Sequence, residues 1–164
     1  MYVATINIVR FSPEHSEGVF SVILPIQQAE FAIPITREEQ TDLADIPAFY
    51  QRGDGNFWVA LVDNTVVGTV AILDIGDREG ALRKMFVTAS HRGSEHGVAK
   101  RLLETLLAWC GARGQRQIYL GTTAKYLAAH RFYEKNGFRE IGRNQLPSTF
   151  PVMAVDSKFY ARAP

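Results

Sequence analysis

The sequence predicts an α/β fold with a mixed central sheet of about six to seven strands, flanked by about four helices. Strand and helix patterns alternate through the second half of the chain, and this alternation favours parallel pairing between strands. A hairpin pattern in the first half requires antiparallel neighbours. The two kinds of pairing together predict one mixed sheet.

The first half of the chain opens with a strand pattern and a helix signal. Residues 4–11 alternate apolar and polar side chains, which is the period of a half-buried strand. Ser12 followed by Pro13 is typical of a helix start, because serine caps the helix end and proline fits its first turn. Pro25 then kinks or ends this helix, since it has no N–H to continue the hydrogen-bond ladder.

A second helix and a hairpin follow. Thr36 and Glu39 have the spacing of a capping box, which predicts a short helix near 37–45. Strand patterns at 57–63 and 65–75 flank a turn-prone Asp-Asn pair and predict a hairpin. The remaining predicted elements are strands at 81–87, 117–123, 138–143 and 151–160, a helix that begins after Gly97, and a helix at 125–136 that Gly137 ends.

Composition and charge are those of an ordinary globular protein. The chain has 164 residues, of which 46% are hydrophobic and 21% charged, and this predicts one domain over residues 1–164. A net charge of +1 favours neither nucleic acid nor an acidic membrane surface as a partner. No apolar run is long enough to span a membrane, and the N-terminal sequence lacks a signal-peptide pattern. Because Cys110 is the one cysteine, no internal disulfide is expected, and a cytoplasmic location is predicted.

The segment between the predicted strand ending at Val87 and the helix after Gly97 suits an anion. The first N–H groups of a helix lack internal partners, and the helix dipole is positive there. Arg92 and Lys100 add positive charge. The small residues that would let a ligand approach the backbone are Gly93, Ser94, Gly97 and Ala99. A tight turn that merely starts a helix explains the same residues, so this stretch alone does not decide.

Two blocks of residues bear on that choice. The first contains Phe86-Val87, Arg92-Gly93, Gly97-Val98-Ala99 and Leu102-Leu103. The second contains Ala129, Phe132, Tyr133, Glu134, Lys135, Gly137 and Phe138. In this order, over roughly residues 57–160, the chain resembles the GNAT superfamily of N-acetyltransferases, which use acetyl-CoA. The motifs typical of nucleoside triphosphatases and nicotinamide enzymes, GxxxxGK[ST] and GxGxxG, are absent from the sequence.

The resemblance implies a single GNAT-like domain over residues 1–164 with a bulged, splayed central strand. It implies direct transfer of acetyl from acetyl-CoA to a primary amine of a small molecule or peptide, in a ternary complex and without a metal. A backbone N–H around Phe86–Val87 would stabilise the charge on the carbonyl oxygen, and Tyr133 would donate a proton to the departing thiolate. The resemblance assigns cofactor binding to Phe86, Val87, Arg92, Gly93, Ser94, Glu95, His96, Gly97, Val98, Ala99, Lys100 and Tyr133, of which Val87 and Tyr133 are also catalytic.

Two positions depart from the family pattern. The pyrophosphate loop of the family begins with Arg or Gln, where this chain has Ser94. Arg92 takes that role only if the loop carries two extra residues. Many family members also have Asn seven residues before the tyrosine, where this chain has Tyr126.

No acid or histidine stands in a motif that identifies the general base. Each acid near the expected acceptor cleft is predicted to be a solvated surface charge, namely Glu30, Glu38, Glu39, Asp42, Asp74 and Glu79. His91 and His96 lack the spacing of a zinc site, and His130 is predicted to lie at the surface. Cys110 falls on the apolar stripe of a helix, which predicts a core residue and not a nucleophile.

The class of acceptor stays open in the sequence. By resemblance, its pocket would lie between segments 27–51 and 142–151. The acids of the first segment suit a cationic amine, whereas Arg37 and Arg143 would suit a carboxylate. The alternatives to acetyl transfer are a non-catalytic CoA-binding regulatory module, a transferase of another acyl group, and a purely structural α/β domain. The resemblance also allows a homodimer.

Overall fold

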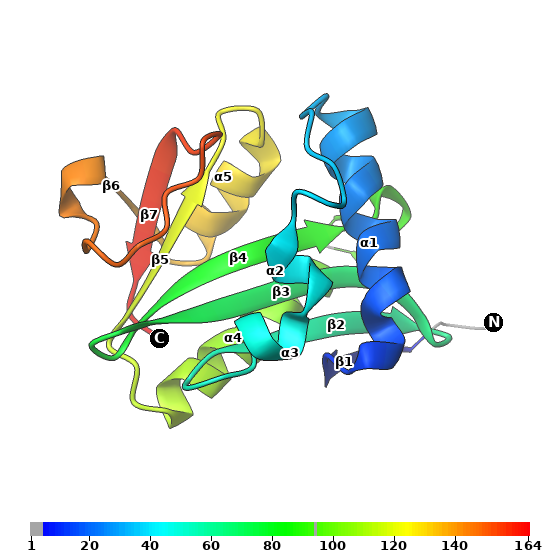
Figure 1. The fold of residues 1–164 in the computed structure, drawn as a ribbon, viewed down its shortest axis with the longest axis horizontal. Helices are drawn as coiled ribbons and strands as arrows, with labels where there is room; N and C mark the ends of the chain where they lie inside the picture. The colour runs from blue at the N-terminus through cyan, green and yellow to red at the C-terminus, as the bar shows by residue number, and fades with distance from the viewer. Residues whose placement is uncertain (1–4, 94) are drawn as a thin grey trace.

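The central element is a mixed sheet of seven strands, formed within residues 5–93 and 95–164, which the computed structural model describes (Figure 1). Its order is β1-β2-β3-β4-β5-β7-β6; β4 and β5 pair in parallel, and all other neighbours are antiparallel. The strands are β1 (Ile6–Arg10), β2 (Asn56–Val62), β3 (Thr65–Gly76), β4 (Glu79–Val87), β5 (Gln117–Thr122), β6 (Arg139–Ile141) and β7 (Lys158–Arg162). The predicted mixed sheet is confirmed.

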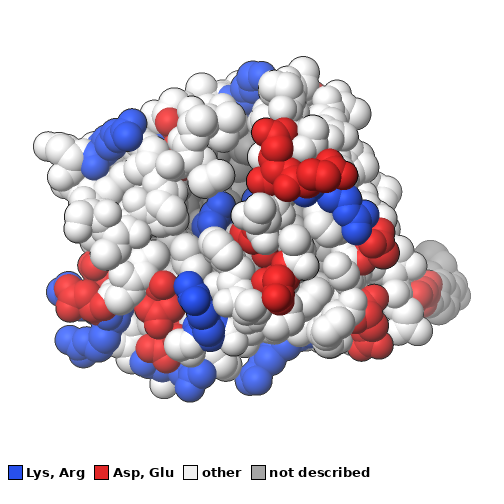
Figure 2. All heavy atoms as spheres, viewed as in Figure 1, with Lys and Arg blue, Asp and Glu red and all other residues white. Residues whose placement is uncertain are grey.

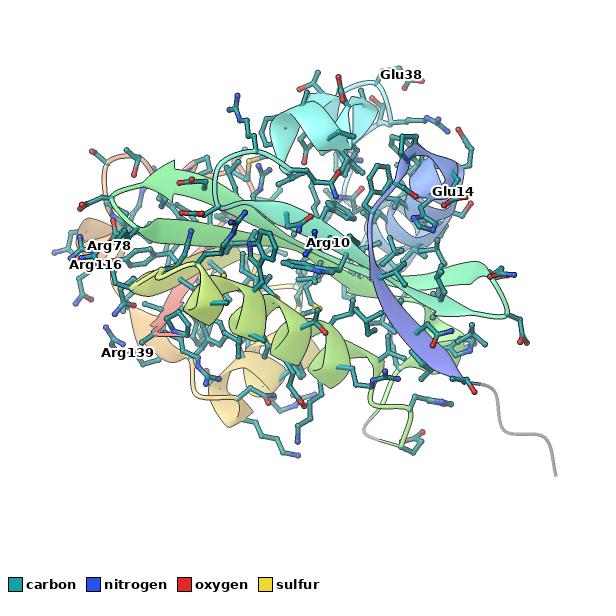
Figure 3. All side chains as sticks on the ribbon, turned by 90° about the horizontal axis from the view of Figure 1, so that it is seen from below. Arg10, Glu14, Glu38, Arg78, Arg116 and Arg139 are labelled. Carbon is teal, nitrogen blue, oxygen red and sulfur yellow. The ribbon has the colours of Figure 1, made fainter. Side chains whose placement is uncertain are left out.

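Five α-helices in the described part of the chain cover the two faces of this sheet (Figures 1 and 3). They are α1 (Ser16–Pro25), α2 (Thr41–Ala44), α3 (Ile46–Phe49), α4 (Val98–Ala112) and α5 (Leu127–Lys135). Helices α1, α2 and α3 pack on one face and α4 and α5 on the other, so each face has its own buried core. Pro25 ends the regular part of α1, and one π-helical turn follows over Ile26–Glu30. None of the helices within the described residues is both long and apolar enough to cross a membrane.

Short-range signals explain most of these element boundaries. Asp63 and Asn64 have positive φ angles of 50° and 63°, the backbone of a tight turn that matches the twist of the β2–β3 hairpin. At the end of α5, Gly137 has a φ of 89°, and the Phe138 N–H donates to the Tyr133 carbonyl at 3.0 Å, as the C-terminal glycine signal predicts. The apolar stripe of α4 is buried against the sheet through Leu102, Leu103, Leu106 and Cys110.

The short helix predicted near 37–45 is present, but it begins only at Thr41 and ends at Ala44. Thr36 and Glu39 do form reciprocal capping bonds, at 3.0 and 3.2 Å between backbone nitrogen and side-chain oxygen. They close a turn, however, and two short helices follow it. Asp45 interrupts the helical backbone and caps α3 with its carboxylate at 3.2 Å, and Pro47 supplies no N–H to carry a continuous helix through this point. This split gives five helices in place of about four.

The last predicted strand also begins too early. Residues 151–157 form turns and loop, and β7 starts only at Lys158. The Asp156 carboxylate accepts the Met153 N–H at 2.9 Å and closes a turn on itself. Pairing with the sheet begins where the Ser157 N–H donates to the Thr122 carbonyl at 2.9 Å.

Candidate active site

The parallel strands β4 and β5 pair at one end and separate at the other, as Figure 1 shows. Their pairing covers only residues 79–81 of β4 and 117–119 of β5. Arg116 fixes the closed end, since its N–H donates to the Arg78 carbonyl at 2.7 Å and its guanidinium pairs with Asp77 at 2.6 Å (Figure 3). The opposite end is therefore free to form a wedge between the two strands.

A β-bulge lies in the open part of β4. Thr69 faces Phe86 across the ladder and Ala71 faces Arg83, so β4 carries one extra residue at this point. Lys84 is that residue by its backbone, with a φ of 59°, and its carbonyl accepts the Thr69 hydroxyl at 2.6 Å. The predicted bulged and splayed strand is confirmed, with the irregularity two residues before Phe86.

In the described part of the chain, the separation of β4 from β5 leaves one edge of β4 without a neighbouring strand. Beyond Ala81, β4 pairs with β3 alone, so the backbone groups of residues 82–87 that face β5 have no strand opposite them. Such an edge accepts an extended ligand as an added strand. Phe86 and Val87, the predicted oxyanion residues, stand at the end of this edge.

The predicted phosphate loop follows directly. Gly93 has a φ of 102°, and Gly97 has a φ of 67° as the residue before α4, so both adopt a left-handed backbone that side chains disfavour. The Gly97 N–H donates to the Gly93 carbonyl at 3.2 Å and folds the loop over the start of α4. Glu95, His96 and Lys100 are exposed at its rim, and Val98 is buried. Ser94 lies outside the described residues.

Arg92 is held by two partners across the molecule. Its Nε donates to the Val87 carbonyl at 2.8 Å, and its two terminal nitrogens donate to the Glu30 carboxylate at 2.6 and 2.7 Å. This bidentate contact holds the pKa of Glu30 below its ordinary value. Nothing in the sequence signals this pair, because its members are far apart along the chain.

The Glu30 carboxylate holds the guanidinium of Arg92, the residue that the family resemblance assigns to cofactor binding. We predict that Glu30→Gln tightens CoA binding by about three- to tenfold, because it releases the charge of Arg92 at a partly exposed site. Calorimetric titration with CoA measures this. The matched control is Glu17→Gln, which breaks the equally bidentate pair between Glu17 of α1 and Arg37 and should leave CoA affinity unchanged. Weaker or equal binding by Glu30→Gln would mean that Arg92 does not contact the phosphates.

Tyr133 lies where both strands and α4 meet. It is 5% exposed and belongs to the same buried cluster as Val87 of β4, Leu120 of β5 and Val98 of α4. Among the described residues, its hydroxyl has no hydrogen-bond partner. Burial raises the pKa of Tyr133 well above its ordinary value, so the phenol stays protonated at neutral pH.

An aromatic bridge joins the two sides of the wedge. The Tyr126 ring meets Phe31 edge to face, with centroids 4.6 Å apart, and Phe86 with centroids 6.3 Å apart. The Lys125 ammonium donates to the Phe31 carbonyl at 3.2 Å. Burial raises the pKa of Tyr126 to about 12. Tyr126 thus fills, with a packed ring, the position where the family has Asn.

Several expectations about single side chains are wrong. Asp42 and Glu79 were predicted to be solvated, yet each is 7% exposed. His130 is buried as well, with Nε2 hydrogen-bonded to the Thr123 carbonyl at 2.9 Å. Cys110 lies in the core as predicted, and burial raises its pKa to about 12, which disfavours the thiolate a nucleophile needs. The acids that are exposed as predicted are Glu30, Glu38 and Glu39.

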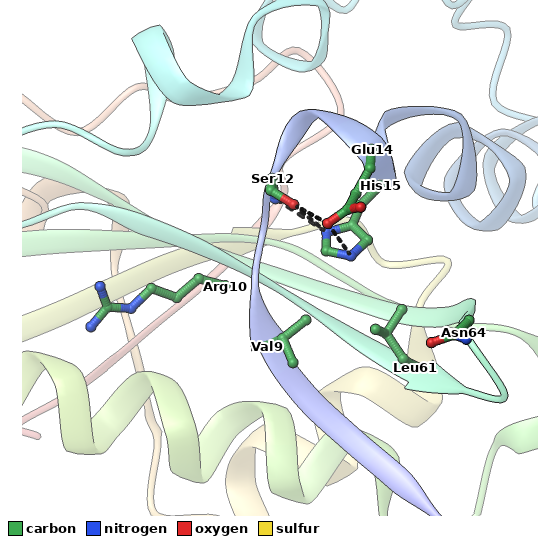
Figure 4. Close-up of a pocket in the computed structure, with 7 residues that line it drawn as sticks. All are labelled: Val9, Arg10, Ser12, Glu14, His15, Leu61 and Asn64. Carbon is green, nitrogen blue, oxygen red and sulfur yellow. Dashed lines mark hydrogen bonds and ion pairs between the residues drawn. The ribbon is translucent and has the colours of Figure 1, made fainter.

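A depression of about 460 Å³ at the outer edge of the sheet lies apart from this arrangement (Figure 4). Its polar groups bond to one another, since the Ser12 hydroxyl donates to Glu14 at 2.9 Å and the Ser12 N–H to His15 at 3.1 Å. It is lined by Val9, Arg10, Ser12, Glu14, His15, Leu61 and Asn64. Within residues 5–93 and 95–164, no group of three or more His, Cys, Asp or Glu side chains is placed to hold a metal ion.

Comparison with known proteins connects this geometry to a family. The chain is 39% identical over 107 residues to N-acetylaspartate synthetase of Danio rerio, a match that covers 64% of this chain and 37% of that protein. The chain thus spans well under half the length of this relative. The crystal structure of an acetyltransferase of the GNAT family from Staphylococcus aureus Mu50 superposes with a TM-score of 0.92 at 38% identity, covering 97% of this chain and 99% of that one.

A more distant structure shares the fold alone. N-acetylglutamate synthase from Neisseria gonorrhoeae, solved with coenzyme A and N-acetyl-glutamate, superposes with a TM-score of 0.73 at 14% identity, covering 99% of this chain and 36% of that one. The model of the acetyltransferase (GNAT) family matches residues 21–138. This match takes in the splayed strands, the loop before α4 and the helix that carries Tyr133. The chain therefore belongs to the GNAT family of acetyltransferases.

Proposed function

We propose that this protein transfers an acetyl group from acetyl-CoA to a primary amine of a small molecule or peptide, by direct attack in a ternary complex. The observation that carries the proposal is the wedge between β4 and β5, which has a free strand edge on one side and the loop 92–100 at its mouth. An extended pantetheine arm pairs with such an edge, and the N–H groups at the start of α4 bind the pyrophosphate. Use of acetyl-CoA is typical of the family.

Two groups then act on the thioester. The amine nitrogen forms a bond to the carbonyl carbon, and the C–S bond breaks. The proton that the nitrogen loses as the amide forms passes through solvent and restores the phenol of Tyr133 after that phenol has protonated the sulfur. A backbone N–H at Phe86–Val87 donates to the carbonyl oxygen as its negative charge develops. Tyr133 donates its phenolic proton to the departing sulfur, and its burial in the same cluster as Val87 of β4 and Leu120 of β5 supports this role. The ammonium form of the amine loses its proton to solvent before attack, and no side chain is assigned as its base.

The proposal extends to the location, the partners and the assembly of the protein. Residues 1–164 act as one cytoplasmic catalytic unit without a metal, and neither nucleic acid nor a membrane is its partner. A homodimer is the assembly to test first. The name of the Danio rerio relative specifies an N-acetylated amino acid as its product, so amino acids belong among the acceptors to be assayed beside simple amines.

Titration with acetyl-CoA and CoA, with 3′-dephospho-CoA as a comparison, tests the first half of the proposal. We expect micromolar binding of both cofactors. An assay for free CoA thiol with a panel of amines tests the second half. Binding without any thiol release would favour a regulatory CoA-binding module, release with propionyl- or succinyl-CoA alone would favour another acyl group, and no binding at millimolar ligand would leave a structural domain.

A further inference from the structure

The bulge in β4 brings two consecutive cations to one face of the sheet. Neighbouring side chains of a regular strand point to opposite faces. Here the Lys84 ammonium lies 3.3 Å from Asp42 of α2, and the Arg83 guanidinium lies 3.9 Å from the same carboxylate oxygen. The left-handed backbone of Lys84 makes this possible, and it is an uncommon conformation for a lysine. The side chains of Arg83 and Lys84 are only 13% and 9% exposed.

Asp42 does not balance this charge. Its Oδ2 atom also accepts the Tyr50 hydroxyl at 2.5 Å, so this oxygen already has a neutral donor beside the two cations. The other contacts of Arg83 are with weak acceptors. One terminal nitrogen lies 3.5 Å from the Met153 sulfur, and the guanidinium carbon lies 5.9 Å from the ring centroids of Phe49 and Tyr50. A guanidinium has five N–H donors, and none of these contacts satisfies them as a carboxylate does.

The charged groups Arg143 and Asp156 do not cancel the excess positive charge of Arg83 and Lys84. Asp156 lies in the field of both Arg83 and Arg143. The five charged groups Arg83, Lys84, Arg143, Asp42 and Asp156 therefore sum to one excess positive charge when all are ionised. Burial lowers the pKa of Lys84, and an anion bound beside the ammonium would offset this effect.

The location of this pair assigns it to the acceptor. Arg83 and Lys84 lie between the closed end of the wedge and Phe86–Val87, on the face covered by α1, α2 and α3. The loop 92–97 leads into α4, which packs on the opposite face. Figure 2 shows the α1 face hollowed between the part with β5 and β7 and the part with α1 and α2, with basic side chains inside the hollow.

We propose that Arg83 and Lys84 bind the carboxylate of the acetyl acceptor, and that this acceptor is therefore an amino acid or another amine that carries a carboxylate. The proposal rests on the proposed acetyltransferase function and narrows its substrate class. A polycationic amine is disfavoured by the same excess charge. The Lys84 ammonium also donates to the side-chain amide oxygen of Gln40 at 3.2 Å, so Asp42 and Gln40 together hold it in place. Arg37 is already bound to Glu17.

The proposal is tested by comparing each amino acid with its α-carboxamide. The amide lacks the negative charge of the carboxylate but has almost the same shape. We expect the free acids to have kcat/KM values at least about 100-fold above those of their amides in the thiol-release assay. Lys84→Gln and Arg83→Gln should each lower kcat/KM for the acid by about 10- to 100-fold, mainly through KM, and leave the amide unaffected. Arg83→Lys keeps the charge and should recover part of the loss. Lys158→Gln removes a half-buried cation that is paired with Glu134 and Glu140, and is the matched control.

Binding gives a second readout that does not require turnover. Amino acids should bind the CoA complex of the wild-type protein, and this binding should weaken in Lys84→Gln while CoA affinity stays close to wild type. Amides acetylated as well as acids would overturn the carboxylate proposal and leave the acetyltransferase function intact. Equal losses for acids and amides would assign the cluster to fold stability and overturn the proposal as well. If neither the acids nor the amides cause any release of CoA thiol, the proposed acetyltransferase function itself is overturned.

Discussion

Replacement of Tyr133 by phenylalanine is expected to lower kcat by about 10- to 1000-fold and to leave CoA affinity near wild type. The change removes one oxygen and keeps the ring, which packs against Phe132, Phe138 and Tyr160. Because the hydroxyl has no hydrogen-bond partner in the described part of the chain, its loss should hardly change the free energy of unfolding. A loss of turnover would thus report the missing proton donor and not a damaged fold. Unchanged turnover would remove Tyr133 from the mechanism.

Tyr160→Phe is the matched control for this experiment. Tyr160 neighbours Tyr133, and its own hydroxyl donates to Glu134 at 2.6 Å, on the outer side of α5. We expect wild-type turnover from this variant. The pH profile adds a separate check: a general acid acts in its protonated form, and burial raises the pKa of Tyr133, so its ionisation should produce no fall in kcat between pH 7 and about pH 10.

The parts of the fold that the sequence predicts well are those set by local patterns. Alternating residues define the strands, the stripe through Leu102 and Leu106 defines α4, and Gly137 ends α5. The bulged strand and the site residues came from the family resemblance, because a bulge is a property of two strands in register. The residues around Lys84 form no sequence pattern that indicates a bulge.

The parts that the sequence could not predict depend on contacts between distant segments. Arg92 reads as a free cation beside a glycine, yet its partner Glu30 comes from the turn after α1. Asp42 reads as a surface acid of a short helix, and only the bulge brings Lys84 and Arg83 beneath it. A buried charge is retained when a partner of opposite sign is buried with it, and partners so far apart in the chain are found only in the folded structure.

Gly97→Val is expected to weaken CoA binding by at least about 100-fold, the second large effect. Gly97 has a φ of 67°, and a β-branched side chain in this backbone region costs about 1–2 kcal/mol. The new side chain would also cover the first N–H groups of α4, where close approach of the pyrophosphate is required. Calorimetric titration with CoA measures the loss.

The control for Gly97→Val must carry the same backbone strain at a different place. Gly114, just beyond the other end of α4, has a φ of 75°, and a Cβ added there meets no atom within 4 Å. Gly114→Val should therefore lower Tm to a similar extent and leave CoA affinity unchanged. If both variants bind CoA equally well, strain at the start of α4 has no effect on the ligand, and the loop 92–100 is only the turn that begins a helix. If only Gly97→Val loses affinity for CoA, binding depends on access of the ligand to the backbone at Gly97. Backbone strain cannot explain such a difference, because both variants carry it.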